Sequence, residues 1–268
     1  MDTHTTPPTT TARSLDELAD IARPLDLTLN VTQLARLARY RDMLHERNQH
    51  VNLTAVRDLD GVERRLILES LRLTQFVQQH AGAGRIMDLG SGGGIPGIVL
   101  AIALPEFQFT LLDATGKKVQ FQRDVIADLG LENVQAVQGR AEELGHDINW
   151  RNSFDLVTAR AVTSLAALME LGLPFVAMKG WLVLPKGTDI DEEMVIGRKA
   201  AGKLGGTVVS QDELRDVGSD VQTRLVLVRK DQATPVSFPR RVGVPAKSPL
   251  GSPQDQAERK PRKKRGGA

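Results

Sequence analysis

A glycine-rich turn with an acidic residue on its N-terminal side is the part of this sequence best suited to bind a ligand. Segment 88–97 reads DLGSGGGIPG and joins a predicted strand at 85–89 to a predicted helix at 95–104. Glycine has no Cβ and tolerates positive φ, so such a loop lets a ligand approach the backbone closely. Three of its glycines satisfy the dinucleotide fingerprint G-x-G-x-x-G, but one match of that kind is weak evidence, and a turn needed only for packing is the alternative.

Two acidic residues narrow the class of ligand. Asp88 lies two residues before Gly90, where its charge would repel a pyrophosphate and favour a cationic ligand. Asp113 follows a predicted strand at 107–112, where a carboxylate accepts hydrogen bonds from ribose hydroxyls or, alternatively, caps the next helix. With Gly92 of the loop, these residues predict a site for an adenosine joined to a positively charged group, and S-adenosylmethionine (SAM) is such a molecule.

The elements that must position these residues alternate between short apolar strands and helices of 10–15 residues. That alternation predicts an α/β fold with a doubly wound, mostly parallel sheet. The expected strands are 85–89, 107–112, 133–137, 154–158 and 181–184, the helices between them are 95–104, 115–129, 162–171 and 189–204, and 206–210 with 222–228 form a terminal antiparallel pair.

The ends of the chain have a different character from the predicted sheet. Residues 1–13 are rich in Thr and Pro and predict a disordered leader, and 14–80 carry the apolar spacing of helices, including one at 61–79. The ligand-binding domain is expected over 84–250, followed by a disordered basic tail at 251–268.

The net charge of +2 conceals an uneven distribution. Residues 239–268 hold nine Lys or Arg against two acidic residues, a net +7, which leaves −5 for residues 1–238. A flexible basic segment binds polyanions without sequence preference, and a tail that serves only solubility is the alternative. Arg240 and Arg241 precede it in a Pro-rich segment and either contact phosphates or anchor the strand pair.

Composition excludes several kinds of chemistry. The 268 residues contain no cysteine, so disulfides, thiolate metal sites and thiol nucleophiles are excluded, among them the thiolate that activates C5 of a pyrimidine. The five histidines show no metal-ligand spacing, so no metal site is expected. No signal peptide or membrane span is recognisable, and a cytoplasmic protein, expected to be a monomer, is predicted.

Three separated motifs resemble one bacterial family. They are RIMDLGSGGGIPGIVLA followed by FTLLDATGKKVQFQRDV, the segment VNLTAV at 51–56, and FPRRVGVP at 238–245. In this order they resemble the glucose-inhibited division protein B family, the ribosomal RNA small subunit methyltransferases G. The resemblance covers about residues 14–250. It implies a Rossmann-like class I SAM-dependent methyltransferase fold with a seven-stranded sheet and an N-terminal helical extension. It also implies SAM as the cofactor and methylation of N7 of one guanine in 16S rRNA. The substrate would be naked 16S rRNA, the 30S subunit or an assembly intermediate.

The resemblance also implies roles for individual residues. Gly90 and Ile95 would line the SAM pocket, and Asp113 would hold the ribose. Ala141 and Glu142 would flank the adenine. Arg160 would occupy the active-site arginine position, as a catalytic residue that also contacts the cofactor. One departure concerns the segment before the sheet, where the family often has a His-Asp-Ser-like run and this chain reads ESL at 69–71.

The residues agree with guanine N7 as the acceptor. Its lone pair lies in the ring plane and methylation removes no proton, so no general base is needed. The Asp/Asn-Pro-Pro-Tyr loop typical of exocyclic amine methylation is absent, since that place reads TARA at 158–161. A guanidinium at Arg160 can donate to guanine O6, to a phosphate or to a cofactor carboxylate, while a structural ion pair is the alternative.

Three other functions stay open at this point. A small-molecule methyltransferase is disfavoured by the tail and by the end motifs, and an NAD-dependent dehydrogenase is disfavoured by Asp88 beside the glycines. A ribosome-binding protein without activity would retain the same fold.

Overall fold

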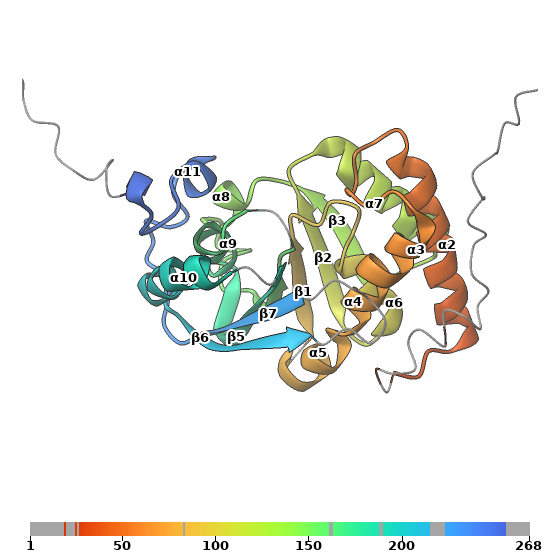
Figure 1. Ribbon diagram of the computed structural model, residues 1–268, viewed down its shortest axis with the longest axis horizontal. Helices are drawn as coiled ribbons and strands as arrows, with labels where there is room; N and C mark the ends of the chain where they lie inside the picture. The colour runs from red at the N-terminus through yellow and green to blue at the C-terminus, as the bar shows by residue number, and fades with distance from the viewer. Residues whose placement is uncertain are drawn as a thin grey trace, which may run out of the picture.

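In the computed structural model, the described parts of the chain are residues 19, 25, 27–82, 84–160, 163–187, 190–214 and 223–255, with side chains left undescribed at 210–214. The expected leader at 1–13 and the tail beyond Asp255 lie outside these residues. Figure 1 shows the N-terminal helices at one end of the molecule, the C-terminal segment at the other, and the sheet between them.

Seven strands form one sheet in the order β3-β2-β1-β4-β5-β7-β6. Their bounds are β1 Arg85–Leu89, β2 Gln108–Asp113, β3 Val134–Gln138, β4 Phe154–Thr158, β5 Val176–Gly187, β6 Gly206–Leu214 and β7 Thr223–Lys230. The first five run parallel, and β7 is antiparallel to both β5 and β6. The predicted doubly wound fold is confirmed, with the strand order reversing between β1 and β4, where ligands of such sheets bind.

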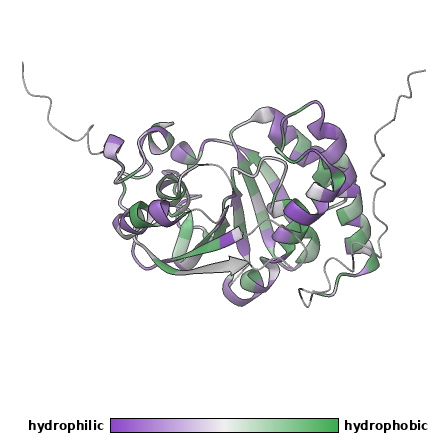
Figure 2. Ribbon diagram, viewed as in Figure 1, coloured by the Kyte–Doolittle hydropathy of each residue, from purple (hydrophilic) through white to green (hydrophobic). Residues whose placement is uncertain are grey.

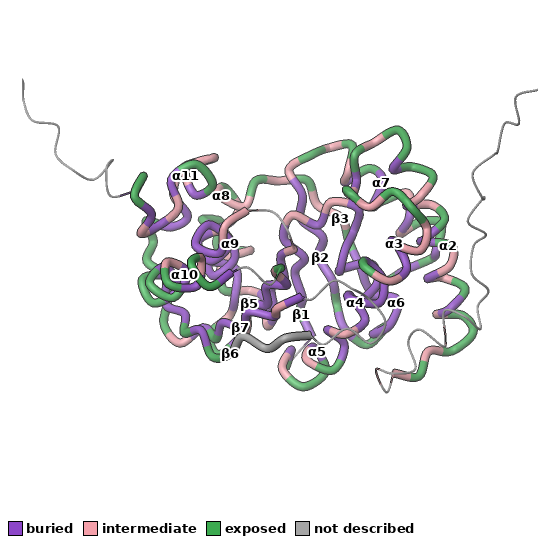
Figure 3. The backbone as a smooth tube through the Cα atoms, viewed as in Figure 1, coloured by how far each residue is buried: buried purple, intermediate pink, exposed green. Residues whose placement is uncertain are grey.

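The strands alternate apolar side chains between two cores, one on each face of the sheet. On β1, Ile86 joins the core beneath the N-terminal helices, whereas Met87 and Leu89 join the other. On β7, Leu225 and Leu227 face the first core, whereas Val226 and Val228 face the second. Figure 2 shows β1 and the helix that follows it as largely hydrophobic, and Figure 3 shows the same elements as buried.

The helices belong to one or the other of these cores. The first core is covered by α2 Val31–Asn48, α4 Glu69–Leu71, α5 Thr74–His80, α6 Gly97–Ala103 and α7 Gly116–Asp128, and the second by α8 Ala141–Leu144, α9 Leu165–Gly172, α10 Asp191–Lys203 and α11 Val244–Lys247. A capping box fixes the start of α2, because Asn30 and Gln33 exchange side-chain to backbone hydrogen bonds of 2.9 Å. The Gln33 amide also donates to the carbonyls of Ile102 and Ala103, which ties α2 to the end of α6.

Three predicted elements were wrong in extent, one of them the strand expected at 206–210, which continues to Leu214 in β6. The single helix expected at 61–79 is a short helix α3 Leu59–Gly61, a π-helix η2 Val62–Leu68, then α4, and finally α5 after a break at 72–73. The strand expected at 181–184 extends over β5, because its antiparallel pairing with β7 runs from Trp181 to Gly187. The start of the first expected helix, near residue 14, lies outside the described residues.

The folded part of the chain reaches further than residue 250. Residues 251–255 are described, and the Asp255 side chain is buried, where it accepts hydrogen bonds from Arg240 Nη1 and Gly251 N. The sequence places these residues in the tail because their composition is polar, whereas their order comes from an arginine fifteen residues earlier.

Candidate functional site

A cavity of about 940 Å³ opens at the carboxyl ends of the parallel strands. Its walls come from the loops after β1, β2, β3 and β4, from the N-terminal segment 52–57 with Arg65 and Leu66, and from Gly243 and Ala246 near the C-terminus. Open α/β sheets bind ligands at this edge, so the cavity is the candidate active site.

The glycine-rich loop forms the floor of the cavity and is held by backbone contacts. Gly90 adopts φ 71°, a left-handed conformation that suits glycine, and its N–H donates to the Leu112 carbonyl at 2.7 Å. Gly94 has φ 89°, and a Cβ there would lie 2.3 Å from Ile98 Cδ1. The Tyr40 hydroxyl of α2 donates to the Gly93 carbonyl at 2.8 Å. The loop is therefore positioned by β2, by α6 and by the N-terminal extension together.

Asp88 supports this loop from behind, and it is not among the described residues that line the cavity. Its side chain is 1% exposed, its Oδ2 accepts from Gly97 N at 2.9 Å, and its Oδ1 has no hydrogen-bond partner among the described residues. Burial raises the pKa of the Asp88 carboxyl to about 7, and the nearby charge of Asp113 adds to the increase. The expected direct contact of Asp88 with a ligand therefore has no counterpart in this geometry.

Asp113 does line the cavity, at the end of β2. Its Oδ2 accepts from Gly92 N at 2.9 Å and its Oδ1 from Thr115 N at 2.8 Å. The carboxylate therefore holds the turn before α7 and also faces the cavity, while its contact with a ribose stays a prediction. An ionised carboxylate has about four lone-pair sites, so it can accept further hydrogen bonds from ligand hydroxyls.

The remaining predicted contacts lie on the walls. Ile95, which is 8% exposed, lines the cavity beside the glycine loop, and Ala141 and Glu142 line it after β3. Glu142 Oε1 also accepts from Gly243 N at 2.8 Å, so the predicted adenine-flanking residue holds the C-terminal segment as well. Gly243 itself has φ 79°.

Arg160 lies after β4 and faces the cavity with its side chain 22% exposed. Its Nη2 donates to the Arg65 carbonyl at 2.6 Å and forms an ion pair with Glu69 Oε2 at 2.5 Å. Burial lowers the pKa of the Arg160 guanidinium, while the Glu69 carboxylate acts in the opposite direction. The structural ion pair that was the alternative for Arg160 is present, and the residue also lines the site.

The N-terminal wall comes from residues 52–57 together with Arg65 and Leu66. Asn48 shapes it, because its Nδ2 donates to the Val56 carbonyl at 2.8 Å and its Oδ1 accepts from Leu53 N and Thr54 N. A Cβ on Gly92 would lie 3.3 Å from the Leu53 carbonyl oxygen, so the wall packs directly on the glycine loop. The VNLTAV motif was the signal that this segment mattered, whereas nothing local in the sequence pointed to Arg65.

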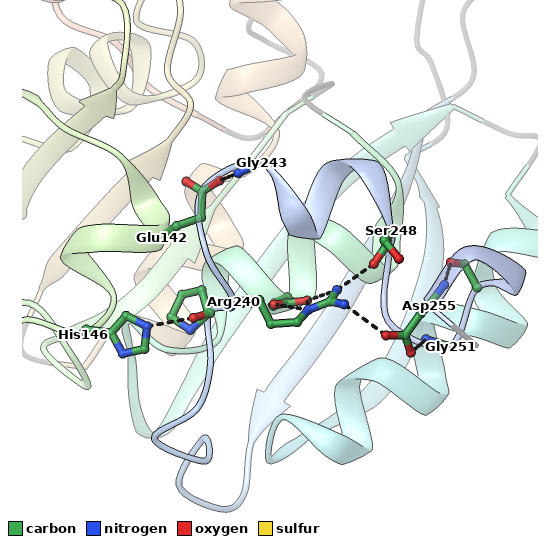
Figure 4. Close-up of polar contacts among 10 residues, drawn as sticks. Glu142, His146, Arg240, Gly243, Ser248, Gly251 and Asp255 are labelled. Carbon is green, nitrogen blue, oxygen red and sulfur yellow. Dashed lines mark hydrogen bonds and ion pairs between the residues drawn. The ribbon is translucent and has the colours of Figure 1, made fainter. Parts of the chain in front are cut away.

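The C-terminal wall is fixed by Arg240 (Figure 4). Its guanidinium contacts both oxygens of Glu170 on α9, Oδ1 of Asp255 at 3.0 Å and the Ser248 carbonyl at 2.7 Å. His146 Nε2 lies 2.7 Å from the Pro239 carbonyl just before it. Of the two interpretations given for Arg240, anchoring is correct, although it anchors this segment to α9 rather than the strand pair.

Two further classes of site find no support in the described parts of the chain. No group of three or more His, Asp or Glu side chains is placed to hold a metal ion there, and no helix there has the length and apolarity to cross a membrane.

Residues 33–220 match the sequence model of the GidB family, described as rRNA small subunit methyltransferase G. The chain is 40% identical over 236 residues to "Ribosomal RNA small subunit methyltransferase G" of Roseiflexus castenholzii, covering 88% of this chain and 100% of that protein. It is 38% identical over 233 residues to the protein of that name from Alkaliphilus metalliredigens, covering 87% and 97%. Among solved structures, M. jannaschii TYW2 in complex with AdoMet aligns with 62% of this chain and 75% of its own at TM-score 0.48 and 16% identity, a likeness too weak to assign function.

Proposed function

This chain belongs to the rRNA small subunit methyltransferase G family, and from that premise we propose that it transfers the methyl group of SAM to N7 of one guanine in 16S rRNA. The observation that carries the proposal is the cavity at the switch point of the sheet, where the glycine loop, Asp113 and Arg160 meet within the matched residues. The N7 position comes from the family resemblance and from the chemistry of the site.

The residues present fit SAM. Gly90, with positive φ on the cavity floor, leaves open the space that a Cβ would fill, and the Asp113 carboxylate can accept from two ribose hydroxyls. Ile95 and Ala141 provide apolar surface for an adenine ring, with Glu142 beside them. When bound, SAM supplies an electrophilic methyl group on a sulfonium.

The residues of the chain would then orient the acceptor base and keep other nucleophilic atoms of the RNA away from the methyl group. An in-line transfer requires the reacting atoms to be about 3 Å apart, so alignment is the main contribution of the protein. Guanine N7 loses no proton on methylation, which agrees with the described lining of the cavity, where no histidine is present. Arg160 would donate to O6 rather than to N7, because a donor on N7 would occupy the lone pair that must attack.

We place the incoming RNA at the exposed rim of the cavity. Arg65, Lys118 and Arg140 line the cavity, and none of the three forms an ion pair with any residue that the structure describes. Several arginines elsewhere on the surface are paired, as with Arg47 and Asp124 at 2.9 Å. Unpaired cations around a site suit the phosphates of a polyanion. Both walls come from one chain, so a monomer suffices, and an rRNA substrate implies a cytoplasmic location.

Mass mapping of 16S rRNA from a deletion strain tests the proposal. We expect the loss of a single 7-methylguanosine, restored by expressing this chain, and calorimetry of the purified protein should detect binding of SAM but not of NAD. Methylation assays with naked 16S rRNA and with 30S subunits then identify the preferred substrate. An unchanged methylation map in the deletion strain would contradict the proposed function.

A further inference from the structure

Glu69 is a buried acid that the proposed function leaves unexplained. It follows the π-helix η2 as the first residue of α4, its side chain is 6% exposed, and it is not among the described residues lining the cavity. Burial of a carboxylate is unfavourable unless it is paired and hydrogen-bonded, so the position needs a reason. Single stretches of π-helix are frequent at functional sites.

The carboxylate of Glu69 is held at both oxygens. Its Oε2 lies 2.5 Å from Nη2 of Arg160, and its Oε1 accepts a hydrogen bond from the Thr223 hydroxyl of β7 at 3.1 Å. A carboxylate fixed from two sides cannot rotate freely, so it presents one oxygen to Arg160 in a defined direction. The contact crosses from the N-terminal extension to the loop after β4.

The two protein contacts of Arg160 leave part of its guanidinium available. Nη2 serves both the Glu69 carboxylate and the Arg65 carbonyl, and Nε and Nη1 make no hydrogen bond with any described residue. Neither atom is among the buried atoms without a partner, and the residue lines the cavity. The contacts of Nη2 therefore fix the orientation of the Arg160 guanidinium, and Nε and Nη1 are available to donate to a ligand.

From this geometry we propose that Glu69 is a positioning residue, which fixes the Arg160 guanidinium so that Nε and Nη1 face the acceptor base. The inference rests on the proposed function of Arg160. Arg65 contributes a second positive charge close to Arg160, which would push the guanidinium away without a buried anion to hold it. Because Glu69 does not itself line the cavity, it acts through Arg160.

Steady-state methylation of 16S rRNA by Glu69→Gln tests the role. The amide nearly keeps the shape of the side chain but removes the negative charge that attracts the Arg160 guanidinium, so Arg160 should be held less firmly. We expect kcat to fall by about 10- to 100-fold, with the Kd for SAM within a factor of about two. Glu69→Asp keeps the charge on a shorter side chain and should recover part of the missing kcat.

A double-mutant cycle identifies the residue through which Glu69 acts. If it acts through Arg160, then Glu69→Gln should have almost no further effect on kcat in an Arg160→Ala background. Multiplying losses in the double variant would overturn the proposal, as would full kcat in Glu69→Gln.

Glu63, on the π-helix that precedes α4, provides a matched control. It is 1% exposed and its Oε1 lies 2.6 Å from Nη1 of Arg41, so it is a buried glutamate paired with an arginine, and it is not among the described residues that line the cavity. Glu63→Gln should lower the melting temperature while leaving kcat of the folded enzyme unchanged. A comparable loss of kcat in Glu63→Gln would mean that any buried acid here acts through stability, which would overturn the proposal. A wild-type enzyme inactive on 16S rRNA would instead count against the proposed function.

Discussion

Two arginines, Arg160 beside the cavity and Arg240 in the C-terminal segment, each face a buried glutamate but differ in how their donors are used. Arg240 donates through all three guanidinium nitrogens, with Nε and Nη2 on Glu170 at 2.9 and 2.7 Å and Nη1 on Asp255 at 3.0 Å. Arg160 makes its described contacts through Nη2 alone. Both side chains are largely buried, at 18% and 22% exposed.

The difference separates two uses of the same side chain. A guanidinium whose nitrogens all have protein acceptors can only stabilise the fold, whereas one with donors left over in a cavity can bind a ligand. The acids opposite the two arginines do not differ in this way, since both oxygens of Glu170 and both oxygens of Glu69 are held.

Removing the Arg240 side chain should cause the largest change, and the change should be in stability. Arg240→Ala leaves Glu170, which is 0% exposed, buried without its ion-pair partner, and breaking a buried pair in this way costs about 3–5 kcal/mol. Chemical denaturation should show this decrease in the free energy of unfolding. Arg241→Ala, an exposed neighbour, is the control and should unfold like the wild type. A stable Arg240→Ala would show that the comparison between the two arginines is wrong.

The equivalent change at Arg160 should act on turnover instead. Arg160→Ala should lower kcat by about a hundredfold, equivalent to about 2.7 kcal/mol, because the acceptor base is no longer aligned. Its free energy of unfolding should fall less than that of Arg240→Ala, because Arg240 also holds Asp255 and the Ser248 carbonyl, whereas Arg160 contacts only Glu69 and the Arg65 carbonyl among the described residues. Single-turnover methylation and denaturation of the same preparations measure both quantities. A strongly destabilised Arg160→Ala whose folded fraction keeps the wild-type kcat would mean that Arg160 is structural rather than catalytic.

Local patterns in the sequence were sufficient to predict most strands of the sheet. The strands β1 and β4 match their predicted bounds, because each is a short apolar run between turn signals. The π-helix η2 could not be predicted, since its residues carry the same apolar spacing as an α-helix and its backbone is set by packing against the rest of the N-terminal extension. The length of β5 depends on pairing with β7, some forty residues later, which no local pattern records.

The residues of the site also divide into those that local sequence patterns predict and those that they do not. Asp113, Ile95 and Arg160 were predictable because each follows a parallel strand, and the ends of those strands converge on one edge. Glu69 was noticed only as a departure from the family, and its contact with Arg160 joins residues 91 positions apart. The sequence position of Asp88 does not reveal that its carboxylate accepts from Gly97 N behind the glycine loop, so its direct contact with a ligand stays a prediction.

The pH dependence of stability tests the acid behind the glycine loop. The folded pKa of Asp88, about 7, lies above its ordinary value of 3.8, so folding favours the protonated form. This stabilisation is fully present below about pH 4 and is lost as the pH rises through 7, with a slope of at most about 1.4 kcal/mol per pH unit. Asp88→Asn, titrated by denaturation between pH 4 and 8, should lose that slope. An unchanged slope would show that Asp88 titrates normally in the folded protein.

Two truncations separate the role of residues 251–255 from that of the basic tail at 256–268. Their effects on stability and on RNA affinity should be the smallest of those predicted. Deleting 256–268 removes six positive charges and keeps Asp255, so stability should not change, while affinity for 16S rRNA falls a few-fold. The slope of log affinity against log salt should then flatten by about 0.7 for each phosphate that the tail no longer neutralises. Deleting 251–268 also removes the carboxylate that pairs with Arg240, so this variant alone should show a lower free energy of unfolding. Equal stability in the two truncations would mean that Asp255 adds nothing to the Arg240 anchor, and an unchanged salt slope would mean that the tail does not bind RNA.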